Sequence, residues 1–136
     1  MATVPLIGDG EAGPEAAMIF DDIRATRNTD YVNNFWRALA LDPAQLARVW
    51  EEAKAVMGPG ALDPLTKELV YIAVSVANSC SYCVHSHTAS ARAKGMTDAQ
   101  HAELLAVIAL AGRTNHLATA LQVPVDPPFD RGGGEP

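Results

Sequence analysis

Two cysteines lie three positions apart, at Cys80 and Cys83. A helix is predicted to begin near Ser81, which puts Cys80 at its N-cap and Cys83 in its first turn. The two sulfur atoms can then approach bonding distance without distortion of the backbone. Unpaired N–H groups and the positive end of the helix dipole stabilise a thiolate at such a position, and motifs of this kind lower a cysteine pKa from about 8.5 to roughly 3.5–7.5. A thiolate attacks a peroxide or a disulfide, so this spacing predicts thiol redox chemistry.

A histidine and a glutamate accompany the cysteine pair. His87 lies one helical turn after Cys83 and can accept a thiol proton. Glu68 stands inside the most apolar predicted helix, where an unpaired carboxylate is costly, so it needs a partner. If helices 64–78 and 81–94 pack antiparallel, Glu68 lies about 18 Å before the turn and His87 about 10 Å after it, at about 1.5 Å per residue. We therefore expect Glu68 to contact His87, directly or through a water, and not to contact a cysteine.

The same residues allow other interpretations. The cysteines can instead be buried small hydrophobic residues or a structural disulfide, and Glu68 can face solvent beside Lys67. A zinc site is the metal alternative, and its candidate ligands are Cys80, Cys83, His85 and His87. Histidines two positions apart on a helix face different directions, so the best form of such a site is one shared between subunits. We expect no metal and no bound cofactor.

The segments that hold these residues are predicted to be helices. Asp42 and Asp63 each place an N-cap aspartate before a proline at the first helical position, which predicts helices over 43–57 and 64–78. The next helix, over 81–94, is expected to stop at Gly95 in a left-handed conformation. Further helices are predicted over 15–26, 30–41, 97–111 with Thr97 as its cap, and 115–122. No window alternates as a half-buried strand does, so the predicted fold is all-α, a compact helical domain with a central antiparallel helix pair.

Two of these helices are unusually apolar. Helix 64–78 carries apolar residues nearly all round its axis and helix 97–111 almost as many, so both are expected to be buried on most sides. A small domain lacks the surface to cover them, and we predict that a subunit interface covers the remainder. The large aromatic residues Trp36, Trp50 and Phe35 are expected in the core.

Length and composition indicate one globular domain. The 136 residues are expected to form a domain over 14–122, between a tail over 1–13 and a Pro/Gly-rich tail over 123–136 that cannot hold a helix. Hydrophobic residues make up 49% and charged residues 19%, which excludes a disordered or coiled-coil chain. The net charge of −6, without a basic stripe, argues against nucleic acid and membrane partners. The first residues do not form a secretory signal and the apolar runs are short, so we expect a cytoplasmic protein.

The order and spacing of four residues resemble the motif of the AhpD-like alkylhydroperoxidases in the carboxymuconolactone decarboxylase superfamily: Glu68, Cys80, Cys83 and His87, separated by eleven, two and three residues. The stretch 91–97 is similar to that family's continuation into the next helix. Upstream, 31–39 is similar to the lead-in of its peroxidase-related branch. One departure is Tyr82, because the best-known members have a histidine between the cysteines, and a phenol is a poor base at neutral pH.

The resemblance implies an all-helical protein that assembles as trimers or larger multiples such as hexamers. It also implies that the dithiol reduces an organic hydroperoxide or hydrogen peroxide. It implies that Cys83 is the peroxidatic cysteine and that Cys80 is the proton donor and resolving thiol, which closes the Cys80–Cys83 disulfide. Glu68 and His87 would form the proton relay, with Tyr82 and His85 as accessory residues. A protein dithiol would then reduce the disulfide, and no cofactor is required.

Two other functions fit these residues. A proton-transfer enzyme related to carboxymuconolactone decarboxylase would use the histidine and the glutamate as acid and base. Such relatives usually lack the cysteine pair. A redox-sensing or partner-binding module would instead change its shape or assembly when the disulfide forms.

Overall fold

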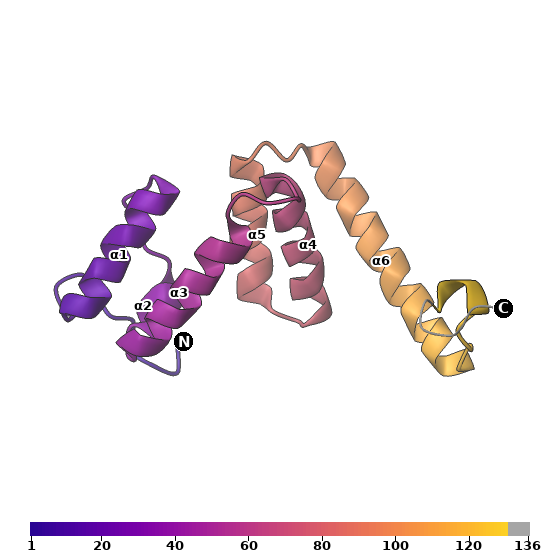
Figure 1. The fold of residues 1–136 in the computed structure, drawn as a ribbon, viewed down its shortest axis with the longest axis horizontal. Helices are drawn as coiled ribbons and strands as arrows, with labels where there is room; N and C mark the ends of the chain where they lie inside the picture. Colours follow the sequence, from indigo (N-terminus) through magenta and orange to yellow (C-terminus); the bar gives the residue numbers. More distant parts are fainter. Residues whose placement is uncertain (131–136) are drawn as a thin grey trace. The chain divides into compact units, whose positions relative to one another are not determined.

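The computed structural model describes residues 1–130, and each regular element in this range is a helix (Figure 1). The elements are α1 (Pro14–Arg27), α2 (Asn34–Leu39), α3 (Pro43–Met57), α4 (Pro64–Ala77), α5 (Ser81–Ala93), α6 (Asp98–Leu121) and the short 3-10 helix η1 (Pro127–Phe129). The predicted all-α fold is therefore confirmed. The chain forms two compact units, residues 1–60 and the residues from Ala61 onward. The single domain over 14–122 stays a prediction, and the part of the expected C-terminal tail over 131–136 lies outside the described residues.

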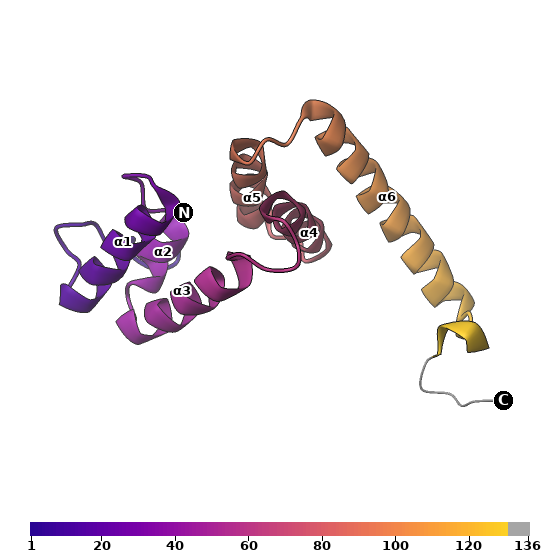
Figure 2. The same ribbon diagram turned by 45° about the horizontal axis from the view of Figure 1, so that its top comes forward.

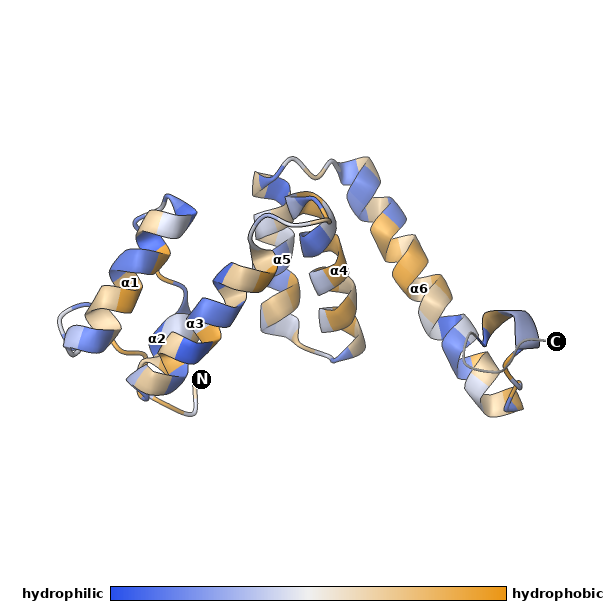
Figure 3. Ribbon diagram, viewed as in Figure 1, coloured by the Kyte–Doolittle hydropathy of each residue, from blue (hydrophilic) through white to orange (hydrophobic). Residues whose placement is uncertain are grey.

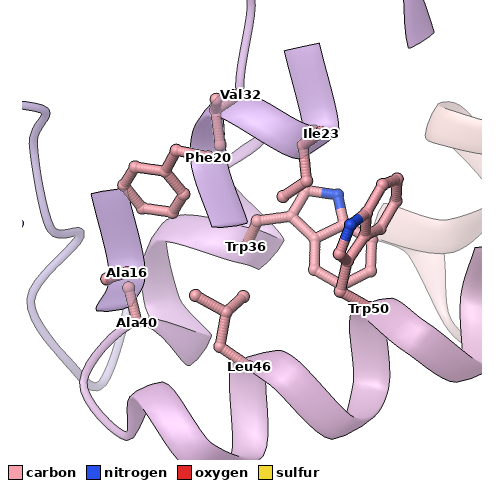
Figure 4. Packing of buried hydrophobic residues seen from close by; sticks show 8 residues of the cluster. All are labelled: Ala16, Phe20, Ile23, Val32, Trp36, Ala40, Leu46 and Trp50. Carbon is pink, nitrogen blue, oxygen red and sulfur yellow. The ribbon is translucent and has the colours of Figure 1, made fainter. Parts of the chain in front are cut away.

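The first unit is built around two tryptophans. α1 and α2 pack on α3, and the rings of Trp36 and Trp50 meet edge to face with their centroids 5.3 Å apart (Figure 4). The buried residues of this core are Ala16, Phe20, Ile23, Val32, Trp36, Ala40, Leu46 and Trp50. The prediction of core positions is confirmed for both tryptophans and is wrong for Phe35. That side chain is 44% exposed, because α2 is short and turns its single buried face, at Trp36, toward α3.

The segment before α1 is attached to this unit. The N–H of Ile7 donates to the carbonyl of Arg37 at 3.2 Å, and the Arg37 guanidinium donates back to the Ile7 carbonyl at 3.0 Å. The same guanidinium pairs with Asp9 at 3.3 Å. Ile7 and Ala12 pack against the core, so part of the segment expected as a tail is held by backbone pairing and burial.

The predicted helix ends are confirmed where the sequence contains a clear capping residue. The Asp42 carboxylate accepts the N–H groups of Ala44 and Gln45, and Asp63 accepts that of Thr66, as expected for N-caps. Gly95 has the left-handed φ of 94° that was expected after α5.

Two predicted helices differ from the structure. The segments 97–111 and 115–122 are one continuous helix, α6, because Gly112 costs a helix about 1 kcal/mol but leaves its backbone hydrogen bonds intact. The helix predicted over 30–41 is only the six-residue α2, since Asn33 takes the N-cap in extended conformation and the chain before it is not helical. Three residues of the expected C-terminal tail also form the 3-10 turn η1.

The second unit contains the central helix pair. α4 and α5 run side by side in opposite directions in both views (Figures 1 and 2). Ile72 of α4, Ala91 of α5 and Met96 form its buried cluster, and Leu104 and Ile108 of α6 pack against that cluster. The predicted central antiparallel pair is therefore present.

The apolar faces of this unit are exposed in the single chain. Val70 and Val74 of α4 are each 52% exposed, and α6 has no buried residue although hydrophobic residues are frequent along its ribbon (Figure 3). The expected burial on most sides is thus not found in the single chain, and the subunit interface that would cover these faces stays a prediction. By length and composition α6 is also apolar enough to span a membrane, a test that core helices of soluble proteins pass as well.

Candidate active site

A tight turn between α4 and α5 sets the position of the cysteine pair. Asn78 caps the end of α4, and Ser79 takes a left-handed φ of 56° that reverses the chain. The N–H of Cys80 then donates to the carbonyl of Ser75 at 2.9 Å, which ties the start of α5 to the last turn of α4. Cys80 is the N-cap of α5, and its Sγ accepts the N–H of Cys83 at 3.3 Å.

The two cysteines are joined as a disulfide. Their Cα atoms are 5.3 Å apart, inside the range that a disulfide spans without backbone movement. Both residues are half-buried, so one edge of the pair remains open to solvent. The structure thus holds the oxidised form of a C-x-x-C dithiol at the N-terminus of a helix.

A buried carboxylate lies across the helix pair. Glu68 of α4 is 4% exposed, and its Oε2 lies 2.7 Å from Nδ1 of His87 on α5. Its other oxygen, Oε1, accepts a hydrogen bond of 2.8 Å from Nζ of Lys94, at the C-cap of α5. Lys94 also donates to Oγ of Ser90 at 3.2 Å. Each carboxylate oxygen therefore has its own donor, which is what a buried charge requires.

The charge state of Glu68 follows from these contacts. Burial raises the pKa of the Glu68 carboxyl, while the hydrogen bonds from His87 and Lys94 lower it. The two donors outweigh burial, so the pKa lies below its ordinary value and Glu68 is a carboxylate at neutral pH. A carboxylate only accepts, so a neutral His87 carries its hydrogen on Nδ1 and leaves Nε2 as the acceptor.

An aromatic ring covers one face of the histidine. The ring of Tyr71 stacks on His87 with centroids 3.6 Å apart and planes 19° from parallel. Tyr71 lies one turn after Glu68 on α4, so the same helix holds the histidine by its Nδ1 edge and by its ring face. The orientation of the imidazole is fixed by both contacts.

The two residues expected to be accessory, Tyr82 and His85, are exposed on α5. Tyr82 is 46% exposed in the first turn, and His85 is also exposed. Among residues 1–130 no three histidine, cysteine or acidic side chains converge as metal ligands. A zinc ion would need both cysteines reduced.

Four of the residues that the sequence singled out are brought to one hairpin of helices: Glu68, Cys80, Cys83 and His87. The contact expected between Glu68 and His87 is present and direct. Two contacts were missed, those of Lys94 and Tyr71. The sequence carries a signal for each, because Lys94 follows His87 by seven residues and Tyr71 follows Glu68 by three, so that each shares a helix face with a site residue.

Comparison with known proteins begins with one protein family. The model of the carboxymuconolactone decarboxylase family matches residues 43–126, which is more than half of the chain. The match includes α3 to α6 and all the residues of the candidate site.

Individual relatives agree with this match. The chain is 66% identical to the alkylhydroperoxidase AhpD core of Rhodospirillum rubrum, whose crystal structure superposes with a TM-score of 0.93 over 95% of this chain and 97% of that one. It is 34% identical to the alkyl hydroperoxide reductase AhpD of Solibacter usitatus over 68% of this chain and 50% of that protein. It is also 39% identical over 42% of its length to uncharacterized protein 4 in the cox locus of Paracoccus denitrificans, of which the match covers 51%. The chain spans about half the length of these two curated relatives.

Proposed function

Because this chain belongs to the carboxymuconolactone decarboxylase family as an AhpD-like member, we propose that it is a thiol peroxidase that reduces hydroperoxides with the Cys80–Cys83 pair. The observation that carries the proposal is the oxidised pair at the start of α5, on the same hairpin as the hydrogen-bonded Glu68 and His87. The name of the Solibacter relative supports an alkyl hydroperoxide as the substrate.

In the first step, the thiolate of Cys83 attacks the outer oxygen of the hydroperoxide. The O–O bond breaks, Cys83 becomes a sulfenic acid, and the alcohol leaves after taking up one proton. The N-terminus of α5 favours the thiolate, because its free N–H groups and dipole stabilise negative charge there.

In the second step, Cys80 attacks the sulfur of the sulfenic acid. The S–S bond forms, the S–O bond breaks, and the hydroxyl leaves as water with the thiol proton. One hydroperoxide and two thiols thus become one alcohol, one water and one disulfide. A protein dithiol then reduces the disulfide by exchange and returns both thiols.

The relay moves the protons of these steps. The hydrogen bond to Glu68 leaves Nε2 of His87 as the acceptor, one turn along α5 from Cys83. Glu68 stabilises the imidazolium that forms when Nε2 takes a proton, as a buried carboxylate does for a catalytic histidine. Tyr82 and His85 are accessory in this scheme.

Single cysteine substitutions test the proposal. Cys83→Ser is expected to abolish peroxide consumption, and Cys80→Ser to consume one equivalent and stop as a trapped sulfenic acid or mixed disulfide. Stoichiometric peroxide titration with mass spectrometry of the product measures both. Undiminished turnover in both variants would refute the scheme. Activity that survives complete alkylation of the thiols would indicate the proton-transfer enzyme instead.

The wider setting of the protein forms part of the same proposal. We expect a homo-oligomer, a trimer or hexamer, in the cytoplasm. The exposed apolar faces of α4 and α6 support the assembly, because such faces are rarely left open to water.

A further inference from the structure

Lys94 has no place in the relay described above, yet it makes the second contact to the buried carboxylate. We propose that Lys94 is a positioning residue of the site: it supplies the permanent counter-charge of Glu68, so that the carboxylate does not depend on His87 for its charge partner and Nε2 of His87 is left to take a proton. This inference deepens the proposed function and rests on it for its catalytic meaning.

The two oxygens of the Glu68 carboxylate contact different donors. Oε1 belongs to Lys94 at 2.8 Å and Oε2 to His87 at 2.7 Å. The Glu68 side chain is 5% exposed, whereas that of Lys94 is 37% exposed. Water therefore solvates the ammonium but not the carboxylate, and Glu68 takes its stabilisation from these two side chains.

Lysine and histidine differ as counter-ions. A lysine hydrogen-bonded to a carboxylate is charged at neutral pH without any change in the histidine. If the lysine charge is removed, the buried carboxylate has one counter-charge fewer, so protonation of its remaining partner or of the carboxylate itself becomes more favourable. The Glu68–His87 pair would then hold an additional proton at neutral pH, and Nε2 of a protonated ring has no lone pair to offer.

Lys94 is itself held in place. Its Nζ donates to Oγ of Ser90 one turn earlier. Its backbone N–H donates to the carbonyls of Ser90 and Ala91 and so closes the last turn of α5. The ammonium is therefore fixed by the end of the same helix that carries His87 and the cysteine pair.

The ionisable side chains on the elements around this pair include Tyr71, Asp98 and His101. On α4, Tyr71 stacks on His87. On α6, which packs against α4, Asp98 and His101 lie near the helix start and both contact Arg92 of α5, at 2.8 and 3.4 Å. In the oxidised protein neither cysteine titrates, so the disulfide form isolates the effect of Lys94.

NMR of the oxidised protein tests the inference. In Lys94→Met the midpoint of the Glu68 carboxyl 13C titration is expected to rise by about one pH unit or more, and the ring 15N signals of His87 at pH 7 are expected to move from neutral imidazole toward imidazolium. Lys94→Arg should restore both signals. The matched control is Arg92→Met, which removes a cation two residues away that pairs with Asp98, and it should leave both signals unchanged.

Unchanged Glu68 and His87 signals in a folded Lys94→Met protein would overturn the inference, as would a failure of Lys94→Arg to restore them. If Lys94→Met does not fold, the double variant Lys94→Met with Glu68→Gln replaces it in the test, because this variant removes the buried carboxylate charge together with the lysine charge. Its His87 signals should match those of Glu68→Gln alone, and a difference between them would overturn the inference. These measurements need no peroxide, so a wild-type protein without peroxidase activity would refute the proposed function and leave this result standing.

Discussion

Glu68 connects the stability of the protein to its proposed chemistry. It is a carboxylate buried between helices and joined to donors on a second helix, so the same hydrogen bonds that orient His87 also hold α4 against α5. Replacement of one member of such a group leaves buried donors or acceptors without a hydrogen-bond partner. The free energy lost in this way exceeds the net stabilisation that the hydrogen bonds provide.

We expect Glu68→Gln to lower the free energy of unfolding at pH 7 by about 1–2 kcal/mol, since an amide accepts more weakly than a carboxylate and turns an N–H group toward one donor. The folded pKa of Glu68 lies below its ordinary value near 4.5. Its contribution is therefore fully present above that value and is lost as the pH falls through the folded pKa. Urea unfolding of both proteins at pH 7, 5 and 3 measures the difference, which should shrink toward pH 3. A difference that is constant over this range would contradict the assignment.

At the scale of single residues, the sequence was sufficient to predict the contact of Glu68 with His87. Helical rise and an antiparallel turn bring those two positions together, and burial supplies the need for a partner. Lys94 was missed because its reach depends on where α5 ends. The stacking of Tyr71 on His87 depends on side-chain rotamers, which spacing does not specify.

At the scale of elements, caps decided which boundaries were predictable. α3 and α4 each begin with an aspartate and a proline, and both start where expected. The sequence predicted two separate helices over 97–111 and 115–122, and Gly112 lies in the gap between them. Ala111 and Arg113 beside it are good helix formers, and the hydroxyl of Thr114 donates to the carbonyl of Leu110 within the same helix, which runs on to Leu121.

A continuous α6 makes a prediction about Gly112. Gly112→Ala should raise the free energy of unfolding by about 0.5–1 kcal/mol, because alanine loses less backbone entropy in a helix. A Cβ atom built there meets nothing within 4 Å. Thermal and urea unfolding measure the change. A decrease in stability would contradict a free Gly112 position and would mean that another chain packs closely against it.

At the scale of the whole molecule, the two units have different roles. The unit of residues 1–60 has a compact core of its own, closed by the tryptophan pair. All the candidate site residues lie in the other unit, whose buried cluster is small and whose long helix α6 has no fully buried residue. A unit with so little buried apolar area has little stability of its own, and association would supply more.

Assembly is therefore expected to depend on α6. Leu110 is 63% exposed there. Leu110→Glu places a charge on this apolar face and should shift the protein toward monomers by at least tenfold in dissociation constant, as measured by sedimentation equilibrium. Ala25→Glu adds the same charge in the other unit and serves as the control. A wild-type protein that is a stable monomer at micromolar concentration would contradict the predicted interface.

The hairpin of α4 and α5 has a consequence for how such a site can be inherited. The contiguous stretch from Glu68 to Lys94 contains the carboxylate, the imidazole, the ammonium group and both sulfur atoms. Their alignment is set by the three-residue turn between α4 and α5, which reverses the chain. Insertions outside that stretch leave the length of the reversal unchanged, although Met96 beyond it also packs against the two helices. These groups thus fall within a block of fewer than thirty residues, and a single residue added to or deleted from the reversal would rotate the sulfur atoms relative to the Glu68–His87 pair.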